Sequence, residues 1–319
     1  MAPRDLAIAI PARDAGAHLR DLISQVAEAG IFAQVIVSDD ASDPPVDPAD
    51  LDAGAARLDV IRSDRPGGAG AARNRALEAV RTRDVLFFDA DDRLAPALAG
   101  IADLHAASGA DFTVFRHADS RVPGPPGGFA VDEGRWDAAL GGEAQGALGR
   151  ARAATLAPIA NYPWNKLYRA DFLRANGVRC SETPVHNDIL LHWGGFLHAR
   201  SIVASRLIGA RHVVRVGGGH LTRRVGPERL CLFDALGDVL AILRRAADRP
   251  LFTAPFLEFA QSVIGWNLDM LRGEVRAAFA ERARLWTLGL HPAEIAAFAA
   301  ARPLRAERLV AVAGGEVAP

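Results

Sequence analysis

The chain has 319 residues, enough to bury a full hydrophobic core in one large domain or two smaller ones. Hydrophobic residues make up 50% and charged residues 24%, a composition typical of a soluble globular protein. The formal net charge of −1 provides no global attraction to nucleic acid or to anionic lipid. Nucleic acid is therefore not expected as a partner, and any phosphate must be bound locally.

The cysteine content and the N-terminal sequence favour a cytoplasmic protein. The chain has two cysteines, too few for a disulfide framework or a zinc site. The first 20 residues include five charged side chains, which argues against a signal peptide. No apolar run approaches the ~18 residues that a membrane-spanning helix needs.

Strand and helix patterns alternate through the first part of the chain. Short apolar runs predict strands at residues 6–10, 35–37, 58–61, 85–88 and 111–115. Helical spacing covers residues 15–29 and 69–80, and helix-compatible sequence covers residues 93–107. This alternation predicts an α/β fold with a mostly parallel central sheet covered by helices.

The second part is mostly helical. Helical spacing marks residues 136–157 and 189–199, whereas residues 201–216 are compatible with two short strands. From Pro227 onwards the pattern is helical, at residues 229–246, 252–271, 276–288 and 292–301. We therefore expect an α/β domain over residues 1–226 and a helical C-terminal extension over residues 227–319.

The composition of this extension leaves its role open. Its helices have apolar faces and several arginines, so they are compatible with covering the sheet, forming a homodimer or contacting a membrane surface peripherally. Covering the sheet is the default expectation. Four tryptophans are interpreted as core or helix-packing residues: Trp136, Trp193, Trp266 and Trp286.

Three carboxylates follow the fourth predicted strand: Asp89, Asp91 and Asp92. The carboxyl end of a buried strand is where open α/β sheets bind ligands. Repulsion among three acids would destabilise the fold unless a cation lies among them. All-oxygen ligation favours Mg²⁺ or Mn²⁺, which keeps open positions for phosphate oxygens. The alternative is that Asp92 alone caps the next helix. A cap needs one Asp, so three of them favour the cation.

The ends of the first two predicted strands carry weaker motifs. Pro11, Ala12 and Arg13 would lie at the same sheet edge, although a plain turn is the favoured interpretation of that motif alone. Asp39 and Asp40 end the second strand. A carboxylate here would suit the imide N–H and ribose hydroxyls of a uridine or thymidine nucleotide. A turn whose Asp and Ser side chains bond their own backbone is equally compatible.

A glycine-rich turn at residues 66–70 precedes the helix that carries Arg73 and Asn74. It matches neither the phosphate-loop pattern nor the dinucleotide fingerprint. Arg73 near the helix start would suit contact with a nucleotide, assisted by the helix dipole. The alternative is a solvated arginine at a helix N-terminus.

In this order and spacing, the four motifs resemble the family-2 glycosyltransferases, which have the nucleotide-sugar-binding GT-A fold. The resemblance covers about the first 225 residues. It implies that Asp39 and Asp40 bind the nucleoside and that Asp89-Ala90-Asp91 is the Asp-x-Asp element, whose metal holds the donor diphosphate. Asp91 is then the expected direct ligand and Asp89 faces the ribose or donor sugar, which leaves Asp92 to cap the next helix. The remaining matching positions are Arg73 and Asn74, the Ala-Arg-Asn element.

Residues 164–169, Trp-Asn-Lys-Leu-Tyr-Arg, resemble a further segment of this family. The only lysine of the chain, Lys166, and its only two tyrosines lie within residues 161–168. In a chain so poor in both residue types, this clustering suggests a chemical need. We predict that Lys166 takes part in donor binding.

The resemblance also supplies a candidate general base. Members of this type usually continue to a Glu-Asp pair, and here Asn187-Asp188 stands at that place, with Asn in place of Glu. Asp188 aligns with the carboxylate that takes the proton from the acceptor hydroxyl in an inverting transfer. The alternative is that Asp188 caps the predicted helix at residues 189–199.

A glycine-rich segment follows a predicted strand and contains His220, Arg223 and Arg224. Its glycines suit a lid that closes over the donor. In the GT-A fold such a loop often brings a His to the metal and basic residues to the phosphates. A lone His is more often structural or solvated, which stands as the alternative for His220.

These patterns predict a Mn²⁺- or Mg²⁺-dependent inverting glycosyltransferase. It would move a sugar from a nucleotide donor, UDP-linked, to a hydroxyl of a glycan or glycolipid acceptor, by family analogy in surface polysaccharide or glycolipid synthesis. A sugar nucleotidyltransferase is disfavoured because the N-terminal segment lacks its glycine-rich basic signature. A non-catalytic binding or scaffold protein of the same fold is the other alternative, kept open by Asn187.

Overall fold

The computed structural model describes residues 3–122, 130–214 and 224–314. The first four predicted apolar runs form one side of a nine-stranded sheet, in the order β3-β2-β1-β4-β8-β6-β9-β5, with β7 paired to β9. The parallel strands of this side, with the two helices that connect them, are β1 (Arg4–Ala12), α1 (Gly16–Ala29), β2 (Phe32–Asp39), β3 (Arg57–Arg62), α2 (Gly68–Ala79) and β4 (Asp84–Phe87). The predicted α/β class with a mostly parallel sheet is confirmed.

The other side of the sheet mixes strand directions. β8 (Lys166–Arg169) is antiparallel to both of its neighbours, β4 and β6 (Phe112–Asp119). β9 (Ile202–His212) runs parallel to β6, and it is one strand where two short ones were expected. The remaining strands, β5 (Arg93–Leu94) and β7 (Gln145–Leu148), pair antiparallel with β9. β7 therefore interrupts the helix predicted over residues 136–157.

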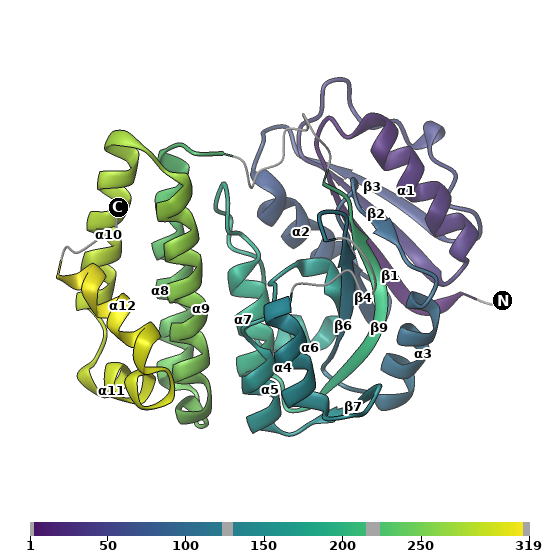
Figure 1. The fold of residues 1–319 in the computed structure, drawn as a ribbon. Coiled ribbons are helices and arrows are strands. Elements are labelled where there is room, and N and C mark those ends of the chain that lie inside the picture. The colour runs from purple at the N-terminus through teal and green to yellow at the C-terminus, as the bar shows by residue number, and fades with distance from the viewer. Residues whose placement is uncertain (1–2, 123–129, 215–223, 315–319) are drawn as a thin grey trace.

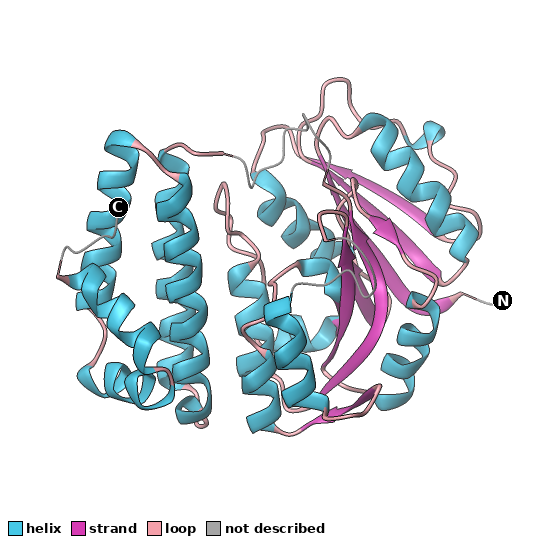
Figure 2. Ribbon diagram, in the orientation of Figure 1, coloured by secondary structure: helices cyan, strands magenta, loops and turns pink. Residues whose placement is uncertain are grey.

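Helices cover both faces of the sheet (Figures 1 and 2). Alternating side chains of β1 explain how, because neighbouring residues of a strand point to opposite faces. Leu6, Ile8 and Ile10 enter the core beneath α1 and α3 (Leu98–Ser108). The other face, with Ala7 and Ala9, belongs to a second core. The helices on that face are α2, α4 (Ala130–Leu140), α5 (Arg150–Leu156), α6 (Ala170–Ala175) and α7 (Ile189–His198).

The C-terminal part begins with a 3₁₀ turn, η4 (Pro227–Cys231), and continues as helices. These are α8 (Leu232–Arg245), α9 (Arg249–Met270), α10 (Gly273–Leu288), α11 (Pro292–Ala301) and α12 (Pro303–Ala313). This bundle packs on α7 and α5, so it covers the helix layer (Figure 1). The default expectation had been that these helices would cover the sheet itself. The last helix, α12, was not predicted.

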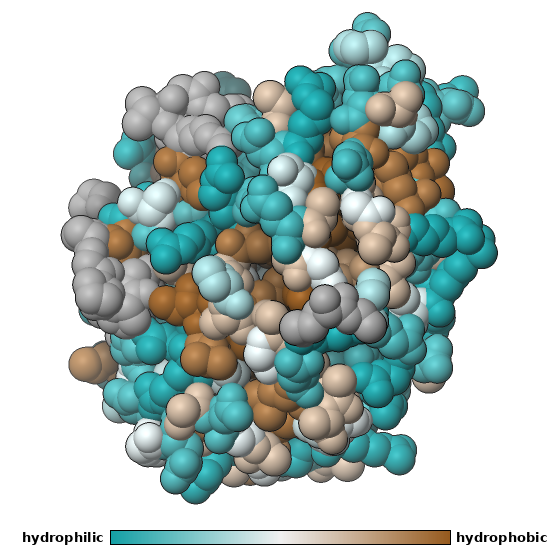
Figure 3. Space-filling view, turned by 90° about the vertical axis from the view of Figure 1, so that its right-hand side faces the viewer, coloured by the Kyte–Doolittle hydropathy of each residue, from teal (hydrophilic) through white to brown (hydrophobic). Residues whose placement is uncertain are grey.

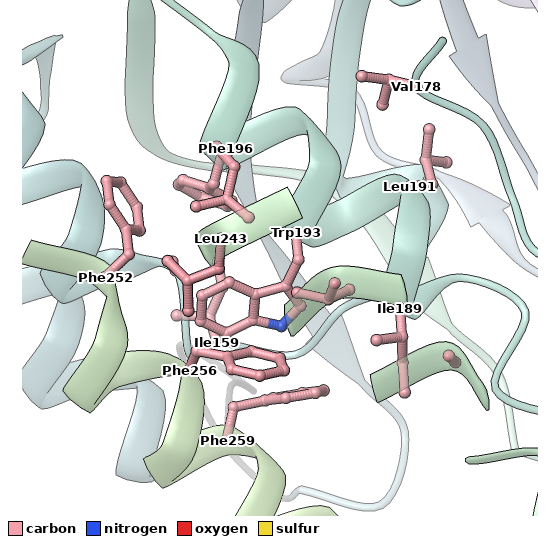
Figure 4. Packing of buried hydrophobic residues seen from close by; sticks show 14 of the residues in the cluster. Ile159, Val178, Ile189, Leu191, Trp193, Phe196, Leu243, Phe252, Phe256 and Phe259 are labelled. Carbon is pink, nitrogen blue, oxygen red and sulfur yellow. The ribbon is translucent and has the colours of Figure 1, made fainter. Parts of the chain in front are cut away.

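An aromatic contact joins the bundle to the α/β part (Figure 4). Trp193 of α7 is fully buried against Phe256 and Phe259 of α9, with ring centroids 5.2 and 5.4 Å apart. One hydrophobic cluster includes residues from both sides of the predicted boundary at 226/227. The division into two domains stays a prediction.

The tryptophan expectation fails at one position. Trp136 and Trp193 lie in the core, and Trp286 is partly buried, but Trp266 of α9 is 41% exposed. On the face that lies away from the helical bundle, hydrophilic side chains surround smaller hydrophobic areas (Figure 3). Among the described residues, no helix is both long enough and apolar enough to span a membrane.

Candidate active site

Four predicted motifs converge at one edge of the sheet because the carboxyl ends of parallel strands lie together. The turn after β2 contacts the start of α2, and α2 contacts both the turn after β4 and the loop that leads into α7. We call this loop, residues 180–188, the 180–188 segment. Its residues are distant in sequence from α2, and side-chain hydrogen bonds fix its position.

Asp39 is fully buried at the end of β2. Its carboxylate accepts hydrogen bonds from the backbone N–H groups of Ser42 (2.9 Å) and Val46 (3.2 Å) and from Nη1 of Arg62 (2.5 Å). Burial alone would raise the pKa of Asp39, but these hydrogen bonds outweigh it, and the pKa is lowered. Asp39 therefore stays ionised and orders the turn after β2.

The neighbouring loop after β1 is tied to the same turn. The N–H of Asp14 donates to Oγ of Ser42 (3.0 Å), and Asp14 accepts from the N–H of Asp43 (2.9 Å). Helix α1 has no side-chain cap, so Asp14 does not cap it. Three residues of this loop were predicted to contact a donor. Pro11 is partly buried, Ala12 is buried and Arg13 is exposed.

Asp40 holds the glycine-rich turn at the start of α2. Its two carboxylate oxygens accept from the N–H groups of Gly67 (2.9 Å) and Gly68 (2.7 Å), and Arg75 donates to it at 2.8 Å. Gly68 has φ of +85°, a conformation that favours glycine. The carboxylate therefore satisfies N–H groups at a helix start. The predicted nucleoside contact of Asp40 is untested.

Arg73 bridges the turn of residues 89–91 and the 180–188 segment. Its side chain is 5% exposed; Nη1 donates to Oδ1 of Asn187 (2.8 Å), and Nη2 donates to Oδ1 of Asp89. Burial would lower the pKa of Arg73, but the charge of Asp89 outweighs it and raises the pKa. The close approach of α2 to the 180–188 segment depends on Gly70, because a Cβ added there would lie 2.0 Å from the carbonyl oxygen of Ser181.

Asn74 reinforces the same contact. Its Nδ2 donates to the carbonyl oxygen of Cys180, and its Oδ1 accepts from the N–H of Cys180, both at 3.0 Å. Both ends of the amide are therefore used to pin the 180–188 segment to α2. The structure gives Asn74 a positioning function, while its predicted contact with the donor stays a prediction.

Asp89, Ala90 and Asp91 form a partly exposed turn directly after β4. Asp92 behaves differently: it is 2% exposed, and its Oδ1 lies 2.8 Å from Nδ1 of His212 and accepts from the N–H of Val213 (2.9 Å). Burial raises the pKa of Asp92 to about 6, although the hydrogen bond with His212 opposes the shift. The expectation that Asp92 caps the next helix is wrong, because α3 begins at Leu98 without a side-chain cap.

His212 was missed in the sequence. It ends β9, and its ring also packs against Tyr162 at 5.1 Å between centroids. Tyr162 in turn stacks on Trp164, with ring centroids 4.4 Å apart and an interplanar angle of 11°. Which residue of β9 faces Asp92 depends on strand register, and a single sequence carries no signal for it.

Lys166 is completely buried in β8. Its Nζ donates to the carbonyl oxygen of Tyr162 (2.9 Å) and to Oδ1 of Asn165. Burial lowers the pKa of Lys166 to about 7, while the charge of Asp188 opposes the shift. Its hydrogen bonds go to protein oxygens, and its predicted role in donor binding is untested.

Asp188 occupies the N-cap position of α7, but its side chain makes no capping hydrogen bond, so the capping alternative is not observed. The residue is partly buried. Burial raises the pKa of its carboxyl group to about 6; Arg73 opposes this shift, Asp89 adds to it and Lys166 opposes it. Asp188 therefore shares one electrostatic environment with Asp89, Arg73 and Lys166.

The predicted lid falls mostly outside the described residues, including His220 and Arg223. Arg224 is described and exposed, and its carbonyl oxygen accepts from Nε of Arg229 (2.7 Å). In the part of the chain that the structure describes, no group of three or more His, Cys, Asp and Glu side chains is arranged to hold a metal ion.

The chain is similar in sequence to one known family and in fold to several solved glycosyltransferases. The sequence profile of the family described as glycosyl transferase family 2 matches residues 7–128. A search of curated proteins found no match. Among solved structures, residues 1–349 of S. aureus TarS in complex with UDP-GlcNAc superpose with a TM-score of 0.72 at 18% identity, over 99% of this chain and 91% of that one.

A second likeness is weaker. Mannosyltransferase PcManGT from Pyrobaculum calidifontis, in complex with GDP-Man and Mn²⁺, superposes with a TM-score of 0.55 at 16% identity, over 99% of this chain and 89% of that one. At such identities the likeness concerns the fold. The profile match includes the turns after β1, β2 and β4 and the start of α2. The glycosyl transferase family 2 match over residues 7–128 identifies a glycosyltransferase domain, in a chain with a GT-A-like fold and a helical C-terminal region.

Proposed function

We propose that this enzyme transfers a sugar from a nucleotide donor, UDP-linked, to an acceptor hydroxyl with inversion at the anomeric carbon. The ligands of the structural neighbours, UDP-GlcNAc in TarS and GDP-Man in the mannosyltransferase, support a nucleotide-sugar donor. We further propose a glycan or glycolipid as the acceptor, and residues 1–226 as the unit that binds the donor.

The observation that carries the proposal is the environment of Asp188. Its carboxylate does not cap α7, it is partly buried, and its pKa of about 6 makes it a stronger base than an ordinary aspartate. A base of this pKa is still ionised at neutral pH. It lies close enough to Arg73 and Asp89 for both to shift its pKa.

In the proposed reaction Asp188 accepts the proton of the acceptor hydroxyl. The hydroxyl oxygen attacks the anomeric carbon from the side opposite the nucleotide, and the bond between that carbon and the diphosphate oxygen breaks. Arg73 holds the Asp89 turn and the 180–188 segment in one geometry, so that base and donor are aligned before the reaction.

Asp89 and Asp91 fit a hard divalent cation, Mn²⁺ or Mg²⁺, because carboxylate oxygens are the ligands that such ions prefer. Two carboxylates on one turn suit an ion that completes its coordination with diphosphate and water oxygens. When bound, the ion would neutralise charge on the departing diphosphate. The Mn²⁺ in the mannosyltransferase complex supports this assignment.

The test is an assay of donor turnover with a panel of nucleotide sugars, with Mn²⁺, with Mg²⁺ and with EDTA. We expect one donor to be hydrolysed or transferred only when the metal is present. Asp188→Asn should bind that donor as wild type does and lose turnover by roughly 10²–10⁴-fold.

Asp171→Asn serves as the matched control because Asp171 is 94% exposed on α6, and it should retain wild-type turnover. If no nucleotide sugar bound in the presence of either metal, the proposal would be wrong. Full turnover in Asp188→Asn would remove Asp188 as the base.

A further inference from the structure

His212 and Asp92 join the end of β9 to the acidic turn of residues 89–91. The N–H of Asp92 donates to the carbonyl oxygen of Asp89 (3.2 Å), which closes the turn. Oδ1 of Asp92 lies 2.8 Å from Nδ1 of His212 and accepts from the N–H of Val213 (2.9 Å). An ionised carboxylate only accepts hydrogen bonds, so Nδ1 of His212 is the donor.

Asp92 differs in burial from the two acids that precede it. The side chain of Asp92 is 1% exposed, whereas that of Asp89 is 29% exposed and Asp91 is partly buried. Oδ2 of Asp92 is buried and has no hydrogen-bond partner among the described residues, so Oδ1 makes the side-chain link to β9. Burying a carboxylate is unfavourable unless hydrogen bonds compensate. Asp92 is therefore placed to hold the turn, while the other two acids face outward.

Backbone pairing does not fix residues 89–91. The antiparallel pairing of β5 with β9 begins at Arg93, opposite Arg211, so it starts only after the turn has ended. His212 is the next residue of β9, and its side chain extends the connection between the two segments back to Asp92. The turn is therefore linked to β9 through this side-chain pair.

Two aromatic rings fix the orientation of the His212 ring. Its centroid lies 5.1 Å from that of Tyr162 and 5.8 Å from that of Trp164, and these two rings stack on each other at 4.4 Å. Trp164 is fully buried, and Nζ of Lys166 donates to the carbonyl oxygen of Tyr162 (2.9 Å). A ring packed in this way keeps one rotamer, so Nδ1 stays directed at Asp92. The cluster of lysine and tyrosine noted in the sequence thereby acquires a structural task.

We propose that His212 is a positioning residue: through Asp92 it holds the turn of residues 89–91 in the geometry that binds the divalent cation. This inference rests on the proposed function, because it assigns a support to Asp89 and Asp91, the two carboxylates that would hold the metal. Ligands that are held in place before the ion arrives lose less entropy on binding. Residues that orient metal ligands typically contribute about 10–100-fold to metal affinity.

The test measures Mn²⁺ binding to the full chain in the presence of UDP, from the electron paramagnetic resonance signal of free Mn²⁺. His212→Asn keeps a donor where Nδ1 lies, because both nitrogens are bonded to Cγ. His212→Gln moves the amide nitrogen one bond farther from the backbone, and His212→Phe keeps an aromatic ring without a donor. Circular dichroism establishes that each variant is folded before its binding is measured.

We expect the Mn²⁺ dissociation constant to rise about 10–100-fold in His212→Phe and in His212→Gln, and to stay near the wild-type value in His212→Asn. At saturating donor and Mn²⁺, kcat should remain close to wild type in all three, because a positioning residue touches no reacting atom. The matched control is His198→Phe at the last residue of α7, about 15 Å along the helix from Asp188, which should bind Mn²⁺ as wild type does.

A double-mutant cycle tests whether His212 acts through Asp92. Asp92→Ala should weaken Mn²⁺ binding as His212→Phe does, and the double variant should bind no more weakly than either single variant, because both changes break the same link. Additive losses in the double variant would reject this route.

Equal Mn²⁺ affinity in wild type and His212→Phe would overturn the inference. Equal losses in His212→Asn and His212→Phe would also overturn it, because they would show that the whole histidine ring is needed and not its donor. In both cases wild type still binds Mn²⁺ with UDP, so the proposed function stands. Absence of Mn²⁺-dependent UDP binding by wild type would instead count against the proposed function, on which the inference rests.

Discussion

Nη1 of Arg73 donates to Oδ1 of Asn187 at 2.8 Å across 114 positions of sequence. The same guanidinium bonds Asp89, so one side chain of α2 connects the Asp-x-Asp turn with the segment that carries Asp188. The side chain of Asn187 is neutral. It accepts this hydrogen bond without the third carboxylate that a Glu would place beside Asp89 and Asp188. The departure from the family's Glu-Asp pair is therefore compatible with an intact arrangement around the candidate base.

Arg73→Lys tests whether this bridge depends on geometry or on charge alone. A lysine keeps the positive charge, but a single ammonium group cannot reproduce the two separate guanidinium contacts. We expect kcat/KM for the donor to fall about 10–100-fold and the free energy of unfolding to fall by about 1 to 3 kcal/mol. Steady-state kinetics and urea denaturation measure these effects. The control is Arg20→Lys at an exposed position of α1, which should change neither the kinetics nor the stability. Wild-type kinetics in Arg73→Lys would mean that the charge alone is required.

Gly70→Ala tests the close approach of α2 to the 180–188 segment. The new Cβ would lie 2.0 Å from the carbonyl oxygen of Ser181 and 3.0 Å from Cβ of Asn187, and a backbone oxygen cannot move aside alone. We expect a destabilisation of about 1 to 3 kcal/mol, as for other overpacked sites, and a loss of turnover. Gly237 lies within α8, and a Cβ added there would have open space around it. Gly237→Ala should therefore stabilise the protein by up to about 1 kcal/mol. Equal effects of the two substitutions would argue against a tight contact at Gly70.

Asp188→Asn should stabilise the protein while it abolishes turnover. A carboxyl group whose pKa is about 6 in the folded protein and about 3.8 in the unfolded chain opposes folding once it is ionised. That cost is absent below about pH 3.8, grows as the pH rises and is complete above about pH 6. At pH 8 the asparagine variant should therefore be more stable by about 1 to 3 kcal/mol, and the gain should shrink as the pH falls toward 4. Denaturation curves across this range measure it, and a destabilised variant at pH 8 would show a structural role for the carboxylate.

Lys166→Met tests the buried ammonium group. The pKa of Lys166 is about 7 in the folded protein against 10.5 for an ordinary lysine, so protonation opposes folding fully below about pH 7 and not at all above about pH 10.5. The stability of wild type relative to Lys166→Met should therefore rise by about 2 to 4 kcal/mol between pH 6.5 and 9.5. The lost hydrogen bond to Tyr162 adds a term that does not vary with pH. A constant difference across the range would mean that Lys166 stays charged in the fold.

The local patterns of the chain predicted the elements whose signals are local. Apolar runs located β1, β2, β3, β4 and β6, and helical spacing located α1, α2 and α7. The short strand β8 escaped prediction because four residues that begin with a lysine become a strand only through pairing with β4 and β6 on either side. β7 was hidden for the same reason, since its only strand partner is β9 among the described residues.

By itself, the sequence determined the order of the motifs and the acidic turn after β4, because turn chemistry and hydrophobic periodicity act over a few residues. It also carried the resemblance that predicts Asp188 as the base. The partner of each side chain was decided only by the tertiary structure. Asp92 pairs with His212, Asn74 with the backbone of Cys180 and Arg73 with Asn187, across 106 to 120 positions of chain. Such pairings depend on strand register and helix packing, and these follow from how the whole core closes and not from any one segment.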